Sequence, residues 1–349
     1  MVSNFSRRQF LIYGSATLGT SWLLKACSSN QTTTTKGEES QGFKVAIALP
    51  GIITDKAWNQ SGYEGVNLAK QKLGVEVAYV EKVAQADQTE VLSDFARRGY
   101  NVVFAHGGQF DAAIEQTAPQ FPNTFFIGVN GAVKGANIAS LRLDHMQLSY
   151  LCGIIGALMT KSDKLAYIAG QEFQATQEEL RGFELGAKSI KSNIQVIPTF
   201  IGDWNDIVKA KEATLALISS SVDVIYQWLD NSSAAVLQTA SDKGVFSFGN
   251  TRDQLEIAPK SVLTSAVKHL DVAIAYLTEL ANQKQLKGEV YRLGLEREDI
   301  LNLGKFSEVV PESVKQKALT AKQEIITKKI SFEDCKDSGK DTRCVKKAV

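Results

Sequence analysis

The chain has 349 residues, of which 44% are hydrophobic and 22% charged, values ordinary for a globular protein long enough for two domains. Its formal net charge of +1 gives no sign of a nucleic-acid-binding surface, and three histidines leave few places for a histidine-based catalytic or metal site. Six prolines and 26 glycines exclude a collagen-like or low-complexity body.

The first 26 residues are typical of an export signal. Arg7 and Arg8 precede a mildly apolar run over residues 11–24, which is the twin-arginine pattern, and this run is too short for a permanent membrane span. The run ends at Cys27 in a pattern that resembles a bacterial lipobox, which predicts cleavage before Cys27 and a lipid anchor on it. A single uncleaved anchor is the alternative. Residues 27–42 are polar and predict a flexible tether.

Strand and helix patterns alternate from residue 43 onward. Short apolar runs predict buried strands over residues 44–49, 75–80, 101–105, 125–129 and 138–141. Apolar residues at helical spacing predict a helix after each of the first three strands, the second over 88–98 and the third over 111–118. This βαβαβ succession predicts a parallel sheet with helices on both faces.

After a long apolar helix over residues 146–160, the alternation starts again. Predicted strands and helices follow one another over 165–170, 177–191, 194–200, 206–219, 222–226, 233–243, 245–249, 262–267, 270–283, 290–295 and 312–328. The second half resembles the first in order and spacing, so we expect an α/β protein with two similar lobes. The expected first lobe covers 43–145, with 268–325 returning to it in part; the second covers 146–267, and 326–349 is a tail. Such lobes share a multi-strand hinge that permits closure on a ligand.

Residues suited to a small, flat, polar ligand lie where the first strand passes into a helix. Two aromatics (Trp58 and Tyr63), two carboxamides (Asn59 and Gln60) and a carboxylate (Asp55) occur within nine residues. Ligands bind beyond the carboxyl ends of strands in open α/β sheets, and aromatic faces with amides and acids suit a nucleobase. A capping aspartate and two core aromatics are the alternative.

Further candidate ligand residues follow other predicted strands: His106, Asp111, Trp204, Trp228, Asp230, Asn250 and Lys268. Trp204 lies in a polar loop, where a core role is harder to explain than a ligand contact. A core or wall position for Trp228, a structural role for His106 and a solvated surface position for Lys268 are the alternatives.

Four separated motifs together resemble one family. They are residues 55–65, residues 137–141 with 150–153, residues 181–187, and residues 263–268. The resemblance is to the basic membrane protein (BMP) family, lipoprotein substrate-binding components of ABC transporters that are similar to bacterial purine nucleoside receptors. It covers about residues 43–305 and implies a two-lobe periplasmic-binding-protein fold of type I, each lobe being a parallel sheet with helices on both faces.

The resemblance also implies how a nucleoside would be held. Two aromatics enclose the purine: Trp58 or Tyr63 from one lobe and Trp204 from the other. Acids and amides, with Asp55 and Asn59 among them, and the lysine at position 268 hold the ring edge and the ribose.

The chain departs from the family pattern at two places. Asn250 stands where a ribose-binding aspartate is usual, and residues 227–233 replace a segment usually rich in glycine. Asparagine can still bind a hydroxyl, but without the strength of a charged acceptor. These departures bear on the ligand more than on the class of protein.

The resemblance implies a monomeric receptor, anchored through Cys27 at the outer face of the plasma membrane or in the periplasm, that delivers its ligand to an ABC permease and ATPase. A receptor for a sugar or another small polar solute, or a ligand sensor docked on a membrane signalling protein, is the alternative. We find no hydrolase elbow, phosphate-binding loop or metal-ligand motif, so we expect no enzyme activity, cofactor or metal.

The remaining cysteines have separate roles. Cys152 falls within the apolar helix and is expected to be a small buried hydrophobe. Cys335 and Cys344 flank eight residues near the C-terminus, and outside the cytoplasm such a pair predicts a disulfide. Two free thiols are the alternative.

Overall fold

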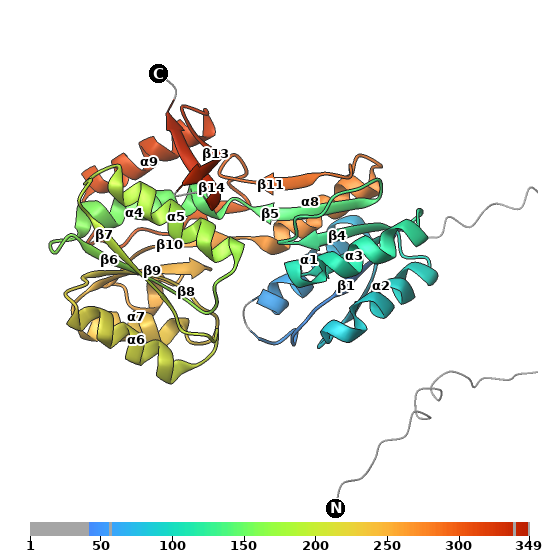
Figure 1. The fold of residues 1–349 in the computed structure, drawn as a ribbon, viewed down its shortest axis with the longest axis horizontal. Helices are drawn as coiled ribbons and strands as arrows, with labels where there is room; N and C mark the ends of the chain where they lie inside the picture. Colours follow the sequence, from blue (N-terminus) through green and yellow to red (C-terminus); the bar gives the residue numbers. More distant parts are fainter. Residues whose placement is uncertain (1–41, 56–57, 338–339, 348–349) are drawn as a thin grey trace, which may run out of the picture. The chain divides into compact units, whose positions relative to one another are not determined.

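A computed structural model describes residues 42–55, 58–337 and 340–347. The twin-arginine segment, Cys27 and the tether therefore lie outside the described residues. Residues 42–349 form one compact unit, which contains two six-stranded sheets and a two-stranded one (Figure 1). This arrangement confirms the predicted α/β class.

The first sheet has the strand order β11-β5-β4-β3-β1-β2, and all its neighbouring pairs are parallel. Its strands are β1 (Lys44–Ala48), β2 (Glu76–Val80), β3 (Val102–His106), β4 (Phe125–Val129), β5 (Ile138–Leu143) and β11 (Val290–Leu293). The helices beside it are α1 (Trp58–Leu73), α2 (Gln88–Arg97), α3 (Asp111–Thr117) and α8 (Leu270–Asn282). The strands β1, β3 and β4 are almost entirely buried, and this burial on both faces explains their nearly continuous apolar sequences.

The second sheet has the order β12-β10-β9-β8-β6-β7. Its strands are β6 (Lys164–Ala169), β7 (Gln195–Phe200), β8 (Val224–Trp228), β9 (Phe246–Thr251), β10 (Val262–Lys268) and β12 (Leu301–Leu303). Within this sheet, the short edge strand β12 pairs antiparallel with β10, and the other described pairs are parallel. The helices of this half are α4 (His145–Met159), α5 (Gln174–Lys188), α6 (Ile207–Ser219), α7 (Ser233–Asp242) and α9 (Glu312–Ile326).

The chain passes between the two sheets three times. It leaves β5 of the first sheet for α4, which packs on α5 and against β8 and β10 of the second half. It returns from β10 to α8, which packs on α1 of the first half, and crosses again between β11 and β12. These three connections form the hinge.

Helices α4 and α5 approach each other closely because glycines lie at their contact. A Cβ atom at Gly186 would meet the carbonyl oxygen of Tyr150, and one at Gly153 would meet that of Phe183. Helix α4 is apolar on nearly every side and correspondingly buried. The pair therefore forms a rigid base that fixes the position of α5 relative to the second sheet.

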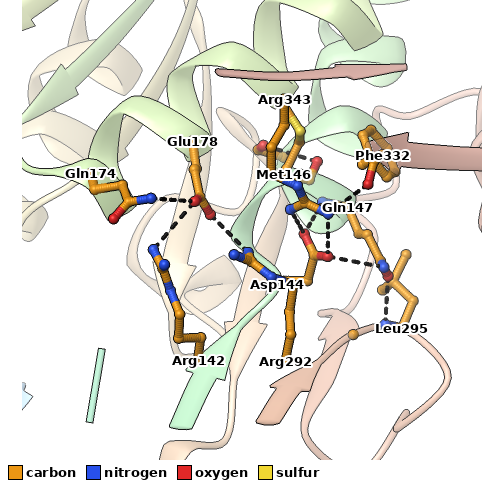
Figure 2. A network of polar contacts seen from close by, with 12 residues as sticks. Arg142, Asp144, Met146, Gln147, Gln174, Glu178, Arg292, Leu295, Phe332 and Arg343 are labelled. Carbon is orange, nitrogen blue, oxygen red and sulfur yellow. Dashed lines mark hydrogen bonds and ion pairs between the residues drawn. The ribbon is translucent and has the colours of Figure 1, made fainter. Parts of the chain in front are cut away.

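An ionic network joins the hinge to the C-terminus (Figure 2). The carboxylate of Glu178 on α5 accepts hydrogen bonds from Arg142 of β5 at 3.2 Å and from Arg292 of β11 at 3.0 Å. Asp144, the N-cap residue of α4, binds both terminal nitrogens of Arg343 at 2.8 and 3.0 Å. Such fork-to-fork pairs fix geometry as well as adding energy.

Arg343 belongs to a hairpin within the segment that we expected to be a C-terminal tail. Strands β13 (Ile330–Asp337) and β14 (Lys340–Lys347) pair antiparallel, and Cys335 and Cys344 form a disulfide across them with a Cα–Cα distance of 5.9 Å. Cys152 is a buried free thiol, as expected. The disulfide closes the hairpin whose arginine reaches the hinge.

Across the described ranges, no helix is both long and apolar enough to cross a membrane.

Candidate functional site

The predicted ligand residues lie at or just beyond the carboxyl ends of parallel strands in both sheets. Asp55 and Trp58 follow β1, and His106 ends β3 in the first sheet. In the second sheet Trp204 follows β7, Trp228 ends β8 and Lys268 ends β10. These loop positions are the ligand-binding edge of an open α/β sheet.

Asp55 and Asn59 shape the loop that precedes α1. The Asp55 carboxylate accepts hydrogen bonds from the backbone N–H of Asn59 at 2.8 Å, from its side-chain amide at 2.7 Å, and from the N–H of Gln60 at 3.0 Å. The Asn59 side chain in turn accepts from the N–H of Gly51 at 2.9 Å. The alternative of a helix-capping aspartate therefore describes much of what Asp55 does.

Trp58 stacks on a buried histidine. Its ring centroid lies 4.2 Å from that of His106 with a 27° angle between the planes, and His106 Nε2 lies 2.9 Å from the Trp58 carbonyl oxygen. Burial lowers the pKa of His106 to about 4, so the ring is neutral and Nε2–H donates to that oxygen. Tyr63 packs instead on Tyr79, with centroids 4.9 Å apart. Of the two aromatic residues in this stretch, Trp58 is therefore the one that stacks on a residue of the first sheet, His106.

Asp111 fixes the loop after β4. One of its carboxylate oxygens accepts from the N–H of Ala132 at 2.8 Å, and the other is buried with no hydrogen-bond partner in the described part of the chain. Burial raises the pKa of this carboxyl group.

The second sheet presents a series of ring contacts. Trp204 lies between two other aromatics, with its centroid 6.4 Å from that of Phe173 at 17° and 6.3 Å from that of Trp228 at 64°. Trp228 also lies 4.7 Å from the ring of His145, the first residue of α4. The Phe173 side chain is 55% exposed and Trp204 is partly buried. An aromatic surface, in which Trp228 is inclined to Trp204, therefore lies at the ends of β6, β7 and β8.

Beneath this surface lies a fully buried carboxylate, Glu179 of α5. It accepts hydrogen bonds from the Tyr226 hydroxyl, from Asn250 Nδ2 at 2.8 Å, and from Lys268 Nζ at 3.0 and 2.8 Å to its two oxygens. Lys268 Nζ also lies 3.6 Å from the ring centroid of Trp228. Lys268 is 6% exposed, so the surface position considered for it is wrong.

One ion pair and one like-charge interaction connect the strand ends of the two lobes. Arg252 after β9 forms an ion pair with Glu64 of α1 at 3.0 Å. Burial raises the pKa of Asp230, beyond β8, to about 7, and the negative charge of Asp55 from the first lobe adds to this shift. The carboxylates of Asp55 and Asp230 therefore lie within electrostatic range of each other.

Three residues of this region escaped the sequence reasoning: Phe173, Glu179 and His145. His145 is 4% exposed, and neither of its ring nitrogens has a hydrogen-bond partner among the described residues. Glu179 carried a detectable signal, because it is four positions before Phe183 on the buried face of α5, where a carboxylate is costly unless paired. Phe173 ends a polar loop and gave no such signal.

A separate cavity of about 390 Å³ lies against the C-terminal hairpin and α9 and contains none of the predicted site residues. Elsewhere, no cluster of three or more metal-binding side chains was found in the portion of the chain that the structure describes. The aromatic strand ends, rather than this cavity, combine flat surfaces with polar groups.

Comparison with protein families gives one match, over residues 43–336, to the Bmp family, described as ABC transporter substrate-binding protein PnrA-like. Three similar proteins illustrate its range. The transcriptional activator protein med of Bacillus subtilis is 27% identical over 78% of this chain and 86% of its own length. The ABC transporter nucleoside-binding protein BmpA of Lactococcus lactis is 28% identical, over 59% of this chain and 60% of its own. A purine-binding protein of Brucella abortus is 29% identical over 64% and 65%.

Solved structures agree on the fold. A transcriptional activator of the comK gene from Bacillus halodurans superimposes with a TM-score of 0.72 at 28% identity, covering 82% of this chain and 98% of its own. A solute-binding protein of an ABC transporter system from Aeropyrum pernix gives a TM-score of 0.73 at 20% identity, over 85% and 94%. The type I periplasmic-binding fold expected from the sequence is thereby confirmed.

Proposed function

Because the chain belongs to the Bmp family of PnrA-like ABC transporter substrate-binding proteins, we propose that it captures a purine ligand, a nucleoside or its base, outside the cytoplasm. The ligand lies between the strand ends of the two lobes and passes to an ABC permease powered by an ATPase. The protein acts as a monomer, and a lipid on Cys27 keeps it at the membrane.

The observation that carries this proposal is an aromatic surface on each lobe. Trp58 is backed by His106 on one side, and Trp204 is flanked by Phe173 and Trp228 on the other. Stacking a base on one aromatic side chain contributes about 1–3 kcal/mol. Two such faces with a few hydrogen bonds supply the roughly 8 kcal/mol of a micromolar complex.

The names of two relatives support a purine as the ligand class. One is described as nucleoside-binding and another as purine-binding, and the matches cover 60% and 65% of their own lengths. The exposed ring of Phe173 offers a planar ligand a face on which to stack.

A thermal-shift screen of the purified protein against purine nucleosides, purine bases, ribose, other sugars and amino acids tests this function. A ligand present at 100 times its dissociation constant stabilises the folded state by about 2.7 kcal/mol, which is a measurable shift. We expect shifts with purines only. A shift with a sugar or an amino acid and none with purines contradicts the proposal.

A sensory role is the second candidate, because one relative and one structural neighbour are described as transcriptional activators. In that case the ligand-bound protein docks on a membrane signalling protein rather than on a permease. Purine uptake by cells that lack this gene separates the two: uptake falls if the protein serves an importer and is unchanged if it serves a sensor.

A further inference from the structure

The C-terminal hairpin of β13 and β14 reaches the hinge through Arg343 (Figure 2). The two terminal nitrogens of Arg343 donate to the two carboxylate oxygens of Asp144 at 2.8 and 3.0 Å. Both side chains are buried, at 10% and 3% exposure. A bidentate pair of this kind fixes the orientation of its two groups as well as their distance. The hairpin is therefore attached to the residue at which the chain passes from β5 to α4, the first hinge connection.

Asp144 extends this attachment to a second hinge connection. Its carboxylate accepts a hydrogen bond from the side-chain amide of Gln147 at 3.2 Å, and the side-chain oxygen of Gln147 accepts from the backbone N–H of Leu295 at 2.9 Å. Leu295 lies between β11 and β12, where the chain crosses between the sheets for the third time. A continuous series of hydrogen bonds thus links the hairpin to two of the three hinge connections.

Packing and a covalent bond hold the hairpin in this position. The Phe332 ring of β13 lies edge-on to Tyr150 of α4, with centroids 5.5 Å apart, and the Phe332 carbonyl oxygen accepts from Arg343 at 3.0 Å. A two-stranded hairpin by itself is only marginally stable in water. The disulfide between Cys335 and Cys344 joins the two strands at the residue that directly follows Arg343. The disulfide and the contact with α4 therefore keep the guanidinium group at the hinge.

The lobes are in contact in the arrangement that the hairpin supports. Arg252 and Glu64 form an ion pair between the strand ends of the two lobes at 3.0 Å. Lobe motion requires changes in the backbone angles of a few residues at the ends of elements. Asp144 is such a residue, and its carboxylate is bound by Arg343 on one side and by the backbone N–H of Gln147 on the other. Rotation at this connection therefore has to break or distort the pair.

We propose that Arg343 is a positioning residue for ligand capture: through Asp144, the disulfide-closed hairpin stabilises the arrangement with the lobes together and so raises the affinity for a ligand bound between them. Arg343 acts on the hinge and does not contact the ligand. The apparent affinity falls in proportion to the population of the binding-competent arrangement, and loss of the pair lowers that population. The effect on affinity rests on the purine-binding function proposed above, whereas the effect on the lobe arrangement does not.

Two variants separate the position of the hinge from the stability of the fold. Arg343→Met leaves the Asp144 carboxylate buried without its cation, which destabilises the protein. Adding Asp144→Asn removes that charge, and asparagine still caps α4. In titration calorimetry with hypoxanthine, we expect binding at least fivefold weaker than wild type in both variants, although thermal melts show stability regained in the double variant. A smaller loss of affinity in the double variant overturns the proposal. Lys346→Met, at an exposed position of β14, is the control and should change the affinity less than twofold.

Small-angle X-ray scattering of the purified protein without ligand measures the lobe arrangement itself. We expect a larger radius of gyration for the double variant than for wild type, and a change in the same direction for serine at both Cys335 and Cys344. Lys346→Met should match wild type. Equal radii of gyration for wild type and the double variant overturn the proposal, whatever the result with hypoxanthine. Failure of the wild type to bind any purine overturns the purine-binding function and leaves the effect on the lobe arrangement to be decided by scattering.

Discussion

Replacing Lys268 by methionine tests the buried Glu179 network most sharply. Methionine keeps much of the volume and apolar stem of lysine but removes the ammonium that lies 2.8 Å from the Glu179 carboxylate. Breaking one partner out of a buried ion pair typically costs about 3–5 kcal/mol. Because the Tyr226 hydroxyl and Asn250 still donate to Glu179, we expect a loss near the lower end, about 3 kcal/mol.

The matched comparison is the double variant Glu179→Gln with Lys268→Met. Glutamine is neutral, so it leaves no uncompensated buried charge, and its carbonyl oxygen can still accept hydrogen bonds from Tyr226 and Asn250. Removing both charges of a buried pair is often close to neutral, so the double variant should be more stable than Lys268→Met alone.

Urea unfolding followed by circular dichroism, with linear extrapolation to water, measures each free energy of unfolding. Lys243→Met, at an exposed position after α7, is the control and should change the free energy by less than about 0.5 kcal/mol. A loss below about 1 kcal/mol for Lys268→Met, or a double variant less stable than this single one, refutes the reasoning.

Three further predictions concern the site and the hairpin. Trp204→Ala should weaken purine binding more than tenfold in titration calorimetry, whereas Ile207→Ala, at a 57% exposed position, should leave it unchanged; equal affinities remove Trp204 from the site. Folding raises the pKa of Asp230 from 3.8 to about 7, so the stability that the protonated Asp230 contributes is full below pH 3.8 and lost as pH rises through 7. Asp230→Asn should therefore be more stable than wild type by about 2 kcal/mol above pH 7 and equally stable near pH 4. Melting temperatures of the two proteins that change in parallel with pH contradict this. Serine at both Cys335 and Cys344 should cost the hairpin about 2–3 kcal/mol of loop-closure free energy, seen as faster proteolysis there; unchanged cleavage speaks against it.

The α/β class could be predicted because buried parallel strands have a recognisable sequence pattern, a short run of apolar residues. Residues 102–106 and 224–228 are almost continuously apolar, and the structure buries every one of them. The long helix near residue 150 could be predicted equally well, because a helix that is apolar on all sides is buried inside a protein. Local pattern and burial agree in these elements.

The Glu179 network could not be predicted, because its partners are distant in sequence. Lys268 lies 89 positions from Glu179, and the sequence around either residue does not indicate the other as its partner. The spacing of Glu179 from Phe183 marks the buried face of α5, but the partners that satisfy this carboxylate become apparent only when α5 is packed against the second sheet.

The hairpin at the C-terminus was missed for a different reason. Its strands carry many charged residues, which hide the alternation that marks a strand. Its position depends on Arg343 reaching Asp144 at the hinge, a contact across 199 residues. The cysteine spacing alone pointed to order in this segment.

The central claim is that a purine stacks on the tryptophans at the strand ends, and tryptophan fluorescence tests it directly. Trp58, Trp204 and Trp228 are the tryptophans from residue 42 onward, and all three lie at the proposed site. Titration of the purified protein with hypoxanthine should give saturable quenching, with a smaller amplitude in Trp204→Phe. Fluorescence that stays constant over the whole titration contradicts the account.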